Sequence, residues 1–374
     1  MGAQPTYRPT LESLESRELL AVQAFVTSGT LNVVGSSSSD FILISQTNQQ
    51  ISVLGTQINV NGARATSVNA GSISRLMVYG NGGNDFISLA TVTNEANIYG
   101  GQGDDYIRCG TGKSEVVRDG GFDRVFRPFS PSAAVVNGAT DADIRQGDAP
   151  LCQTHAALAA AAKQGHNFAN DIRYLGNNWY EVKLYGNLAT QRVYFDGWTT
   201  NVDPIQSSPG EFWTVLMQRA RLQALGIDPR RAYTDAEWDD WNRKTGGRLY
   251  SVGEAIYHFT GSYPTFNAIA AAKPQTLQAA LAHGDYLVAQ SADAYITADG
   301  IIGNHAYTIT AVYYHAGAWK IRLFNPWAID RDDGTTLDAL DKTRPAANDG
   351  YLTLTWAQFT RPANFLGYHH AIKR

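Results

Sequence analysis

A short glycine–aspartate pattern recurs through the first third of the chain and limits the folds open to it. The complete copy, residues 100–107, reads Gly-Gly-Gln-Gly-Asp-Asp-Tyr-Ile, and residues 80–87 repeat it with one departure. Partial copies at residues 35–42 and 120–125 keep the aspartate and the apolar residue after it. Glycine permits tight turns with positive φ, and each apolar residue starts a strand that faces a shared core. The pattern therefore predicts an all-β region of stacked turns and short strands.

This pattern resembles the calcium-binding β-roll repeat of secreted bacterial proteins, in which aspartates and backbone carbonyls of adjacent turns hold Ca²⁺. The resemblance implies an all-β solenoid, a β-roll-like domain, over residues 21–128, with Asp85 and Asp105 as the first candidates for metal ligands. Because only one copy is complete, a degenerate solenoid that binds little or no metal is an equal expectation. Cys109 follows the complete copy and is expected to be structural.

The residues before this region carry an export-like segment. Residues 10–20 resemble the L-E-x-L-E-x-R-x-L-L segment that opens many exported bacterial surface proteins, with a plain amphipathic helix as the alternative. The resemblance implies an extracellular or cell-surface bacterial protein that uses residues 1–20 for export or sorting and can be attached to the surface. No run approaches 18 apolar residues, so no transmembrane span is expected. The net charge of −4 gives no sign of nucleic-acid binding.

A change of composition after residue 127 predicts a domain boundary. Pro128 and Pro131 interrupt the repeat pattern, as expected for a linker. Residues 170–265 then favour helices with aromatic insertions, and Ser251 is placed to cap one of them. From about residue 280 onward short β-branched and aromatic runs favour strands. Helices followed by antiparallel strands predict an α+β domain over residues 129–374.

Cys152 stands at the start of an alanine-rich helix within that domain. Residues 147–150 favour a turn, and the run after them has no interior glycine or proline. The unpaired N–H groups and the positive dipole end of a helix favour a thiolate, which is the reactive form of cysteine. Gln146, six residues upstream, can present its amide to the same point. A buried thiol that only packs is the alternative, as is a disulfide between Cys152 and Cys109.

Two later segments supply partners for such a thiol. His305 opens one expected strand and Asn325 closes the next, so two neighbouring antiparallel strands can bring them side by side. A cysteine at a helix start, a histidine and an asparagine that holds the imidazole form a Cys-His-Asn arrangement. The order Cys152, His305, Asn325, with separations above 100 and then 20 residues, fits a papain-like fold.

The residues around these positions resemble a calpain-type cysteine peptidase catalytic domain between about residues 140 and 370. Four blocks carry the resemblance in order: Gln146-Gly147 with Cys152; residues 213–220 with 257–261; residues 304–308; and Asn325-Pro326-Trp327 with residues 349–352, Trp356 and Phe359. Pro150, Leu151 and Gln153 depart from the family, which usually has Gly-Asp before the cysteine and an aromatic residue after it. The departure concerns the shape of the cleft beside Cys152.

The resemblance implies a papain-like fold, with a helical half and an antiparallel β half, and a cysteine endopeptidase that hydrolyses peptide bonds in proteins. It implies that Cys152, His305 and Asn325 act as the catalytic residues, that Gln146 receives the oxyanion and that Trp327 shields the His305–Asn325 pair. The alternative from another class is an inactive calpain-like surface protein that binds peptides or calcium. Less favoured candidates are His155 as the base and Asp330, Asp332 and Asp333 as a metal site.

Overall fold

The computed structural model describes residues 22–374 apart from 118–119, 131–132, 136–137, 148, 201, 205–210, 232, 294–296, 298, 300 and 328–349. In this part of the chain, six α-helices combine with four β-sheets into a mixed α/β structure. The export-like segment and the acidic cluster at residues 330–333 lie outside the described residues. Among the described helices, none is long and apolar enough to cross a membrane.

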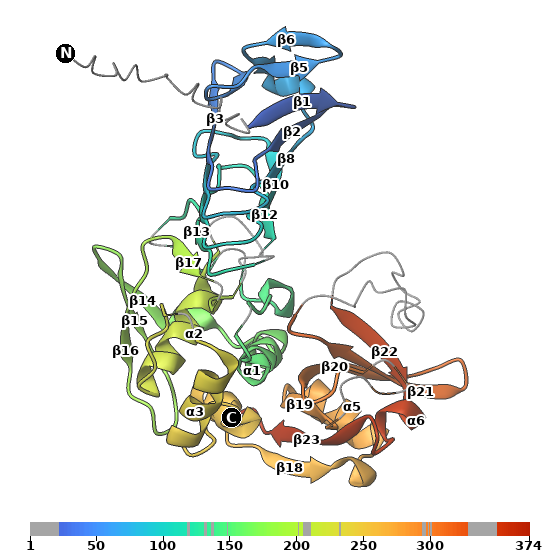
Figure 1. Ribbon diagram of the computed structural model, residues 1–374. Coiled ribbons are helices and arrows are strands. Elements are labelled where there is room, and N and C mark those ends of the chain that lie inside the picture. The colour runs from blue at the N-terminus through green and yellow to red at the C-terminus, as the bar shows by residue number, and fades with distance from the viewer. Residues whose placement is uncertain are drawn as a thin grey trace, which may run out of the picture.

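Residues 22–127, here called the repeat region, form two sheets, and from β7 to β13 successive strands alternate between them (Figure 1). One sheet stacks four parallel strands: β2 (Thr30–Val34), β8 (Arg75–Tyr79), β10 (Glu95–Tyr99) and β12 (Ser114–Val117). The other stacks β3 (Phe41–Thr47), β9 (Phe86–Ser88), β11 (Tyr106–Arg108) and β13 (Arg124–Phe126). Five strands extend the far end: β1 (Gln23–Thr27), β4 (Gln50–Val53), β5 (Ile58–Val60), β6 (Ala63–Ala65) and β7 (Val68–Asn69).

The register of the parallel strands explains why the pattern repeats. It pairs the aliphatic residue of each turn with that of the next, so Ile42, Ile87, Ile107 and Val125 form one fully buried row. Neighbouring turns come so close that a Cβ on Gly101 would lie 2.2 Å from the carbonyl oxygen of Asn81. Glycine is therefore required where the turns touch, and its φ of +97° there suits no other residue well.

A strand from later in the chain closes the repeat region. β13 pairs antiparallel with β17 (Trp198–Thr200), so the second sheet continues across the boundary expected at residue 128. The Trp198 ring lies 4.4 Å from that of Tyr106 and 5.3 Å from that of Phe126. Stacked repeats need a cap on each open end, and the following domain supplies this one.

The helical half of that domain surrounds α1 (Cys152–Lys163) with three more helices: α2 (Trp213–Ala224), α3 (Asp235–Lys244) and α4 (Val252–Thr260). Residues 170–265 are less helical than expected, because residues 172–200 form four strands: β14 (Ile172–Gly176), β15 (Trp179–Val182), β16 (Gln191–Tyr194) and β17. The helix expectation was wrong there because Asn177 and Asn178, both with positive φ, turn β14 into β15 as a two-residue hairpin. The expected cap is confirmed, since the Ser251 side chain accepts the N–H of Glu254 at the start of α4.

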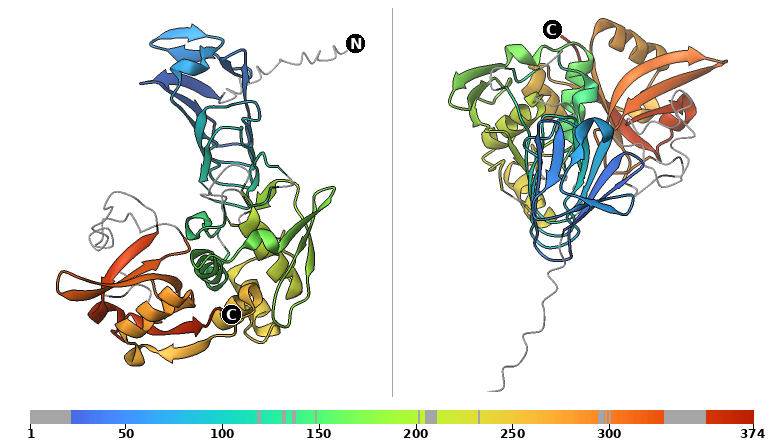
Figure 2. Two further views of the ribbon diagram at one scale, coloured as in Figure 1. Left: turned by 180° about the vertical axis from the view of Figure 1, so that it is seen from behind. Right: turned by 90° about the horizontal axis from the view of Figure 1, so that it is seen from above.

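The sheet half confirms the strands expected after residue 280. It is a six-stranded antiparallel sheet in the order β18 (Thr265–Ala268), β23 (Phe365–Ala371), β19 (Tyr286–Ser291), β20 (Ala306–His315), β21 (Ala318–Phe324) and β22 (Tyr351–Thr355). Two helices accompany it, α5 (Pro274–His283) and α6 (Trp356–Phe359). Helix α1 packs on α4 in one half and on β19 and β20 in the other, as the views in Figure 2 agree. The first residue of α1 therefore lies where the halves meet.

Candidate active site

Cys152 is the first residue of α1, and its side chain is almost fully buried. Burial raises the pKa of the thiol to about 11, although hydrogen bonds from the backbone N–H groups of Ala306 and Gln153 oppose this in part. Desolvation of the thiolate raises the pKa by more than the helix N-terminus lowers it. The thiol is therefore neutral near pH 7 in this arrangement, in contrast to the thiolate expected from its place at a helix start.

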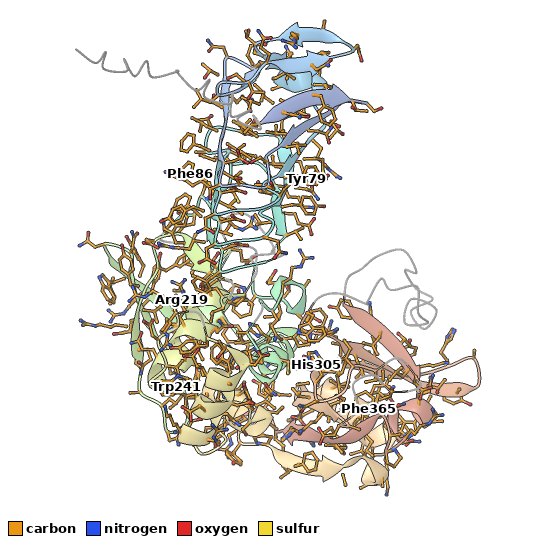
Figure 3. The ribbon with its side chains drawn as sticks, in the orientation of Figure 1. Tyr79, Phe86, Arg219, Trp241, His305 and Phe365 are labelled. Carbon is orange, nitrogen blue, oxygen red and sulfur yellow. The ribbon has the colours of Figure 1, made fainter. Side chains whose placement is uncertain are left out.

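His305 lies directly before β20 and is fixed by its backbone. Its N–H donates to Ser291 Oγ over 2.8 Å, and Ser291 Oγ donates back to the His305 carbonyl oxygen over 3.0 Å. Figure 3 shows the His305 side chain beside α1, and the backbone of the next residue, Ala306, bonds to the Cys152 thiol. Burial lowers the pKa of His305 to about 4, while the Asn325 side chain partly opposes this shift.

Asn325 orients the imidazole ring. The distance from His305 Nε2 to Asn325 Oδ1 is 2.9 Å, and the same oxygen accepts the N–H of Trp327 over 3.0 Å. Because a backbone N–H binds this atom, it is the amide oxygen, and the proton between it and His305 belongs to Nε2. Nδ1 is thereby the nitrogen left to exchange a proton with a thiol.

Aromatic rings cover the His305–Asn325 pair. The Trp327 ring centroid lies 4.5 Å from that of His305, and the Tyr307 ring stands edge-on at 5.0 Å. His305 and Asn325 are each 3% exposed. An apolar cover of this kind limits the access of water to the hydrogen bond.

Gln146 lies next to the Asn325–Trp327 segment. Its backbone N–H donates to the Pro326 carbonyl oxygen over 2.8 Å, which ties the residue to the loop that follows β21. Its side-chain Nε2 donates to the Ala149 carbonyl oxygen over 2.7 Å, and its Oε1 is buried without a hydrogen-bond partner. The amide is thus held in the turn before Cys152, and Nε2 keeps a second N–H beyond the one given to Ala149.

The structure also places His155, the alternative base, and the two cysteines of the alternative disulfide. His155 Nδ1 lies 2.9 Å from the carbonyl oxygen of Leu151 in its own helix, and burial lowers its pKa to about 4. Cys109 and Cys152 are both buried, and no disulfide joins them. A pocket of about 420 Å³ lies between β15, β16 and the end of α2, but neither Cys152 nor His305 lines it.

Asp85 and Asp105 lie in the interior of the repeat region. Asp85 Oδ1 accepts the N–H of Asp40 over 2.7 Å, and the N–H of Asp85 donates to Asp105 Oδ1 over 2.8 Å. Asp85 Oδ2 is buried and has no hydrogen-bond partner. A Cβ built on Gly80 would lie 2.2 Å from this oxygen and 2.1 Å from the Gly100 carbonyl oxygen. The two oxygens therefore pack against Gly80 so closely that only glycine fits at this position. Within the described residues, no group of three or more His, Cys, Asp or Glu side chains is arranged to hold a metal.

Sequence reasoning missed one buried charge beside this site. Arg221 of α2 is fully buried and binds the first turn of α1 through Thr154. Its only sequence signal is an arginine next to the apolar face that residues 212, 215, 216 and 220 form on α2.

A comparison with family models gives a match to the calpain family of cysteine proteases over residues 123–339. It includes Gln146, Cys152, His305 and Asn325, and it begins within the repeat region, one residue before β13. No curated protein matches the chain. Because the family match covers more than half of the sequence, the protein belongs to the calpain family of cysteine proteases.

Proposed function

We propose that the protein is a cysteine endopeptidase that hydrolyses proteins through Cys152, His305 and Asn325. The observation that carries the proposal is the arrangement at the start of β20. There His305 is bound to Asn325 over 2.9 Å, and Ala306 N–H meets the Cys152 thiol. The family match supports peptide-bond hydrolysis as the reaction.

The proton states of this site suggest how the reaction starts. Because burial keeps both Cys152 and His305 neutral near pH 7, the thiolate forms when the thiol proton moves to His305 Nδ1. The sulfur then adds to the scissile carbonyl carbon, and the second N–H of Gln146 Nε2, with the N–H of Cys152, receives the oxyanion. The imidazolium returns its proton to the amine as the C–N bond breaks.

Water completes the cycle. His305 Nδ1 takes a proton from water, and the resulting hydroxide adds to the thioester carbon. The C–S bond then breaks to release the product acid, and the imidazolium returns its proton to the sulfur to restore the thiol. Asn325 keeps the ring in one orientation through both steps, and Trp327 excludes solvent from the bond between them.

The test is a proteolysis assay on an unfolded protein substrate. Cys152→Ala abolishes cleavage, whereas Cys109→Ala, which changes a buried cysteine of the repeat region, keeps it. Each variant needs a wild-type melting curve as its control for folding. Full cleavage by Cys152→Ala contradicts the proposal. If the wild type cleaves no substrate and a thiol-reactive epoxide labels neither cysteine, the inactive binding protein expected as the alternative is favoured.

We also propose that the repeat region is a β-roll-like solenoid that binds Ca²⁺ at Asp85 and the neighbouring turn of Asp105. Parallel pairing of the strands and the buried Asp85 Oδ2, which has no hydrogen-bond partner, support this. Calcium bound only to the folded state raises its stability, by about 2.7 kcal/mol at a hundredfold excess over Kd. A melting curve that calcium does not shift contradicts the proposal.

The place of action is a further proposal. The segment at residues 10–20 supports export to the cell surface or the medium of a bacterium, where calcium is plentiful and protein substrates are accessible. Expression in a bacterial host followed by fractionation tests it, with a variant that lacks residues 1–20 as the control. Equal distribution of the two proteins among the fractions contradicts export by this segment.

A further inference from the structure

Arg221 is a fully buried cation that binds the first turn of α1, which also carries the proposed nucleophile. It lies on α2 and is 0% exposed, although a charged residue is seldom buried unless its donors are all used. Burial lowers the pKa of its guanidinium to about 9, so it stays charged near pH 7. A buried charge of this kind requires hydrogen-bond partners in the surrounding structure.

The guanidinium joins three segments of the chain. Nη1 donates to Thr154 Oγ1 over 2.8 Å and to the Leu249 carbonyl oxygen over 3.2 Å, and Nη2 donates to the Arg248 carbonyl oxygen over 2.7 Å. Thr154 is buried and lies two residues after Cys152 in the first turn of α1. Arg221 thus ties the turn that carries the thiol to the loop that precedes α4.

That loop also approaches the thiol. Its next residue is Tyr250, whose pKa is raised by burial first and then by the charges of Asp239, Asp235 and Cys152. Arg221 therefore binds the carbonyl groups of the two residues that directly precede Tyr250.

His258 lies between the Arg221 guanidinium and the carboxylate of Glu254. Arg221 Nε points at His258 Nδ1 over 3.4 Å, and His258 Nε2 lies 3.0 Å from Glu254 Oε2. Burial lowers the pKa of His258 to about 3, so the ring is neutral. It accepts a hydrogen bond from Arg221 at Nδ1 and donates one to Glu254 from Nε2. The buried cation is thus built into α4 as well as into α1.

We propose that Arg221 is a positioning residue of the peptidase, which fixes the first turn of α1 so that Cys152 faces His305. This rests on the proposed function. A misplacement of about 1 Å can lower a rate by about 10²-fold, so loss of one of these hydrogen bonds acts on turnover. The substrate contacts outside this turn stay in place, and KM changes little.

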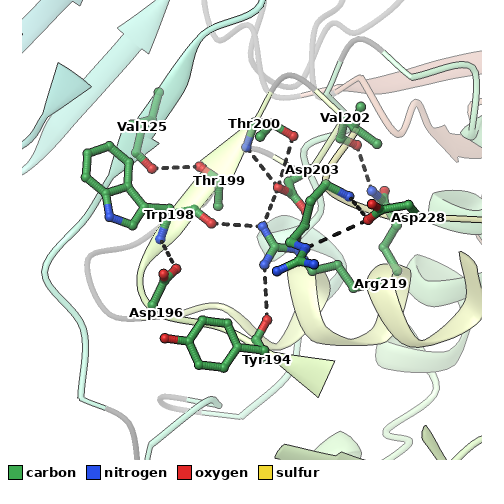
Figure 4. Close-up of polar contacts among 12 residues, drawn as sticks. Val125, Tyr194, Asp196, Trp198, Thr199, Thr200, Val202, Asp203, Arg219 and Asp228 are labelled. Carbon is green, nitrogen blue, oxygen red and sulfur yellow. Dashed lines mark hydrogen bonds and ion pairs between the residues drawn. The ribbon is translucent and has the colours of Figure 1, made fainter. Parts of the chain in front are cut away.

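A neighbouring arginine provides a matched contrast. Arg219 lies two residues earlier on α2, and its guanidinium binds Asp203 and the carbonyl oxygen of Trp198 instead of α1 (Figure 4). In the same network, the buried Thr199 donates to the Val125 carbonyl oxygen over 3.2 Å. Thr199→Val therefore removes a buried threonine hydrogen bond at the repeat-region junction, as Thr154→Val does beside Cys152.

The experiment compares these variants in the full chain. Thr154→Val lowers kcat about tenfold with KM nearly unchanged, whereas Thr199→Val keeps the wild-type kcat, both measured well below each melting temperature. Arg221→Lys, which still donates hydrogen bonds, retains more turnover than Arg221→Met. The second readout is the rate at which iodoacetamide alkylates Cys152, located by peptide mass spectrometry. We expect this rate to change in Thr154→Val and to stay constant in Thr199→Val.

The outcomes separate this proposal from the one on which it rests. Wild-type kcat and wild-type alkylation in Thr154→Val, with the fold intact, overturn the positioning role. If the wild type cleaves no substrate, the proposed function fails, and the alkylation rates alone then decide whether Arg221 positions the thiol. If Arg221→Lys and Arg221→Met both fail to fold, Thr154→Val decides.

Discussion

The junction between the repeat region and the peptidase depends on a buried ion pair, and Asp203→Asn tests it. Arg219 binds both carboxylate oxygens of Asp203 at 2.7 Å, and the two side chains are 3% and 0% exposed. Asp203 Oδ2 also accepts the N–H of Thr200, the last residue of β17. Removing the negative charge leaves a buried cation uncompensated, a change that typically costs about 3–5 kcal/mol. Because asparagine keeps one acceptor, we expect a loss near 3 kcal/mol.

An exposed pair provides the control for this measurement. Arg173 and Glu181 also lie close, at 2.6 Å, but their side chains are 69% and 32% exposed. Glu181→Gln should therefore cost less than about 1 kcal/mol. Urea unfolding followed by tryptophan fluorescence gives both losses, and hydrogen exchange reports β13 and β17 separately. In Asp203→Asn, exchange should accelerate in both strands together. Equal losses in the two variants, or faster exchange in β17 alone, refute this account of the junction.

Three further outcomes follow from the site and the repeat region. Burial raises the pKa of Asp85 from 3.8 to about 6, so without calcium the melting temperature should fall as pH rises from about 4 to about 6, and Asp85→Asn should remove that slope in a thermal scan. Gln146→Ala should lower turnover about 10²–10³-fold while iodoacetamide still labels Cys152. Asn325→Ala should lower turnover because His305 Nε2 loses its acceptor, and a wild-type rate in a steady-state assay would exclude that role.

The features that the sequence predicted are those with local or periodic causes. The strands of the repeat region follow from glycine at each turn and one inward aliphatic residue, as in the buried row through Ile87 and Ile107. The start of α1 at Cys152 follows from a turn that runs into alanine, and the cap at Ser251 follows from a three-residue spacing. The family resemblance also supplied the order of Cys152, His305 and Asn325.

The features that sequence did not predict depend on contacts between distant segments. β13 and β17 are about 70 residues apart, and the sequence of neither strand predicts that it pairs with the other. The bond between Thr154 and Arg221 spans 67 residues, and an arginine on an apolar helix face gives no sign of its acceptors. The neutral thiol of Cys152 also escaped prediction, because the helix N-terminus is visible in the sequence whereas burial is a property of the fold.

The central claim is that Cys152 is the nucleophile and that His305 activates it. The most direct measurement is the site of a peptidyl epoxide adduct, located by peptide mass spectrometry in the wild type and in His305→Ala. We predict one adduct on Cys152, none on Cys109, and a strongly reduced yield in His305→Ala with an unchanged fold. An adduct on Cys109 instead, or an equal yield at Cys152 without His305, contradicts the claim.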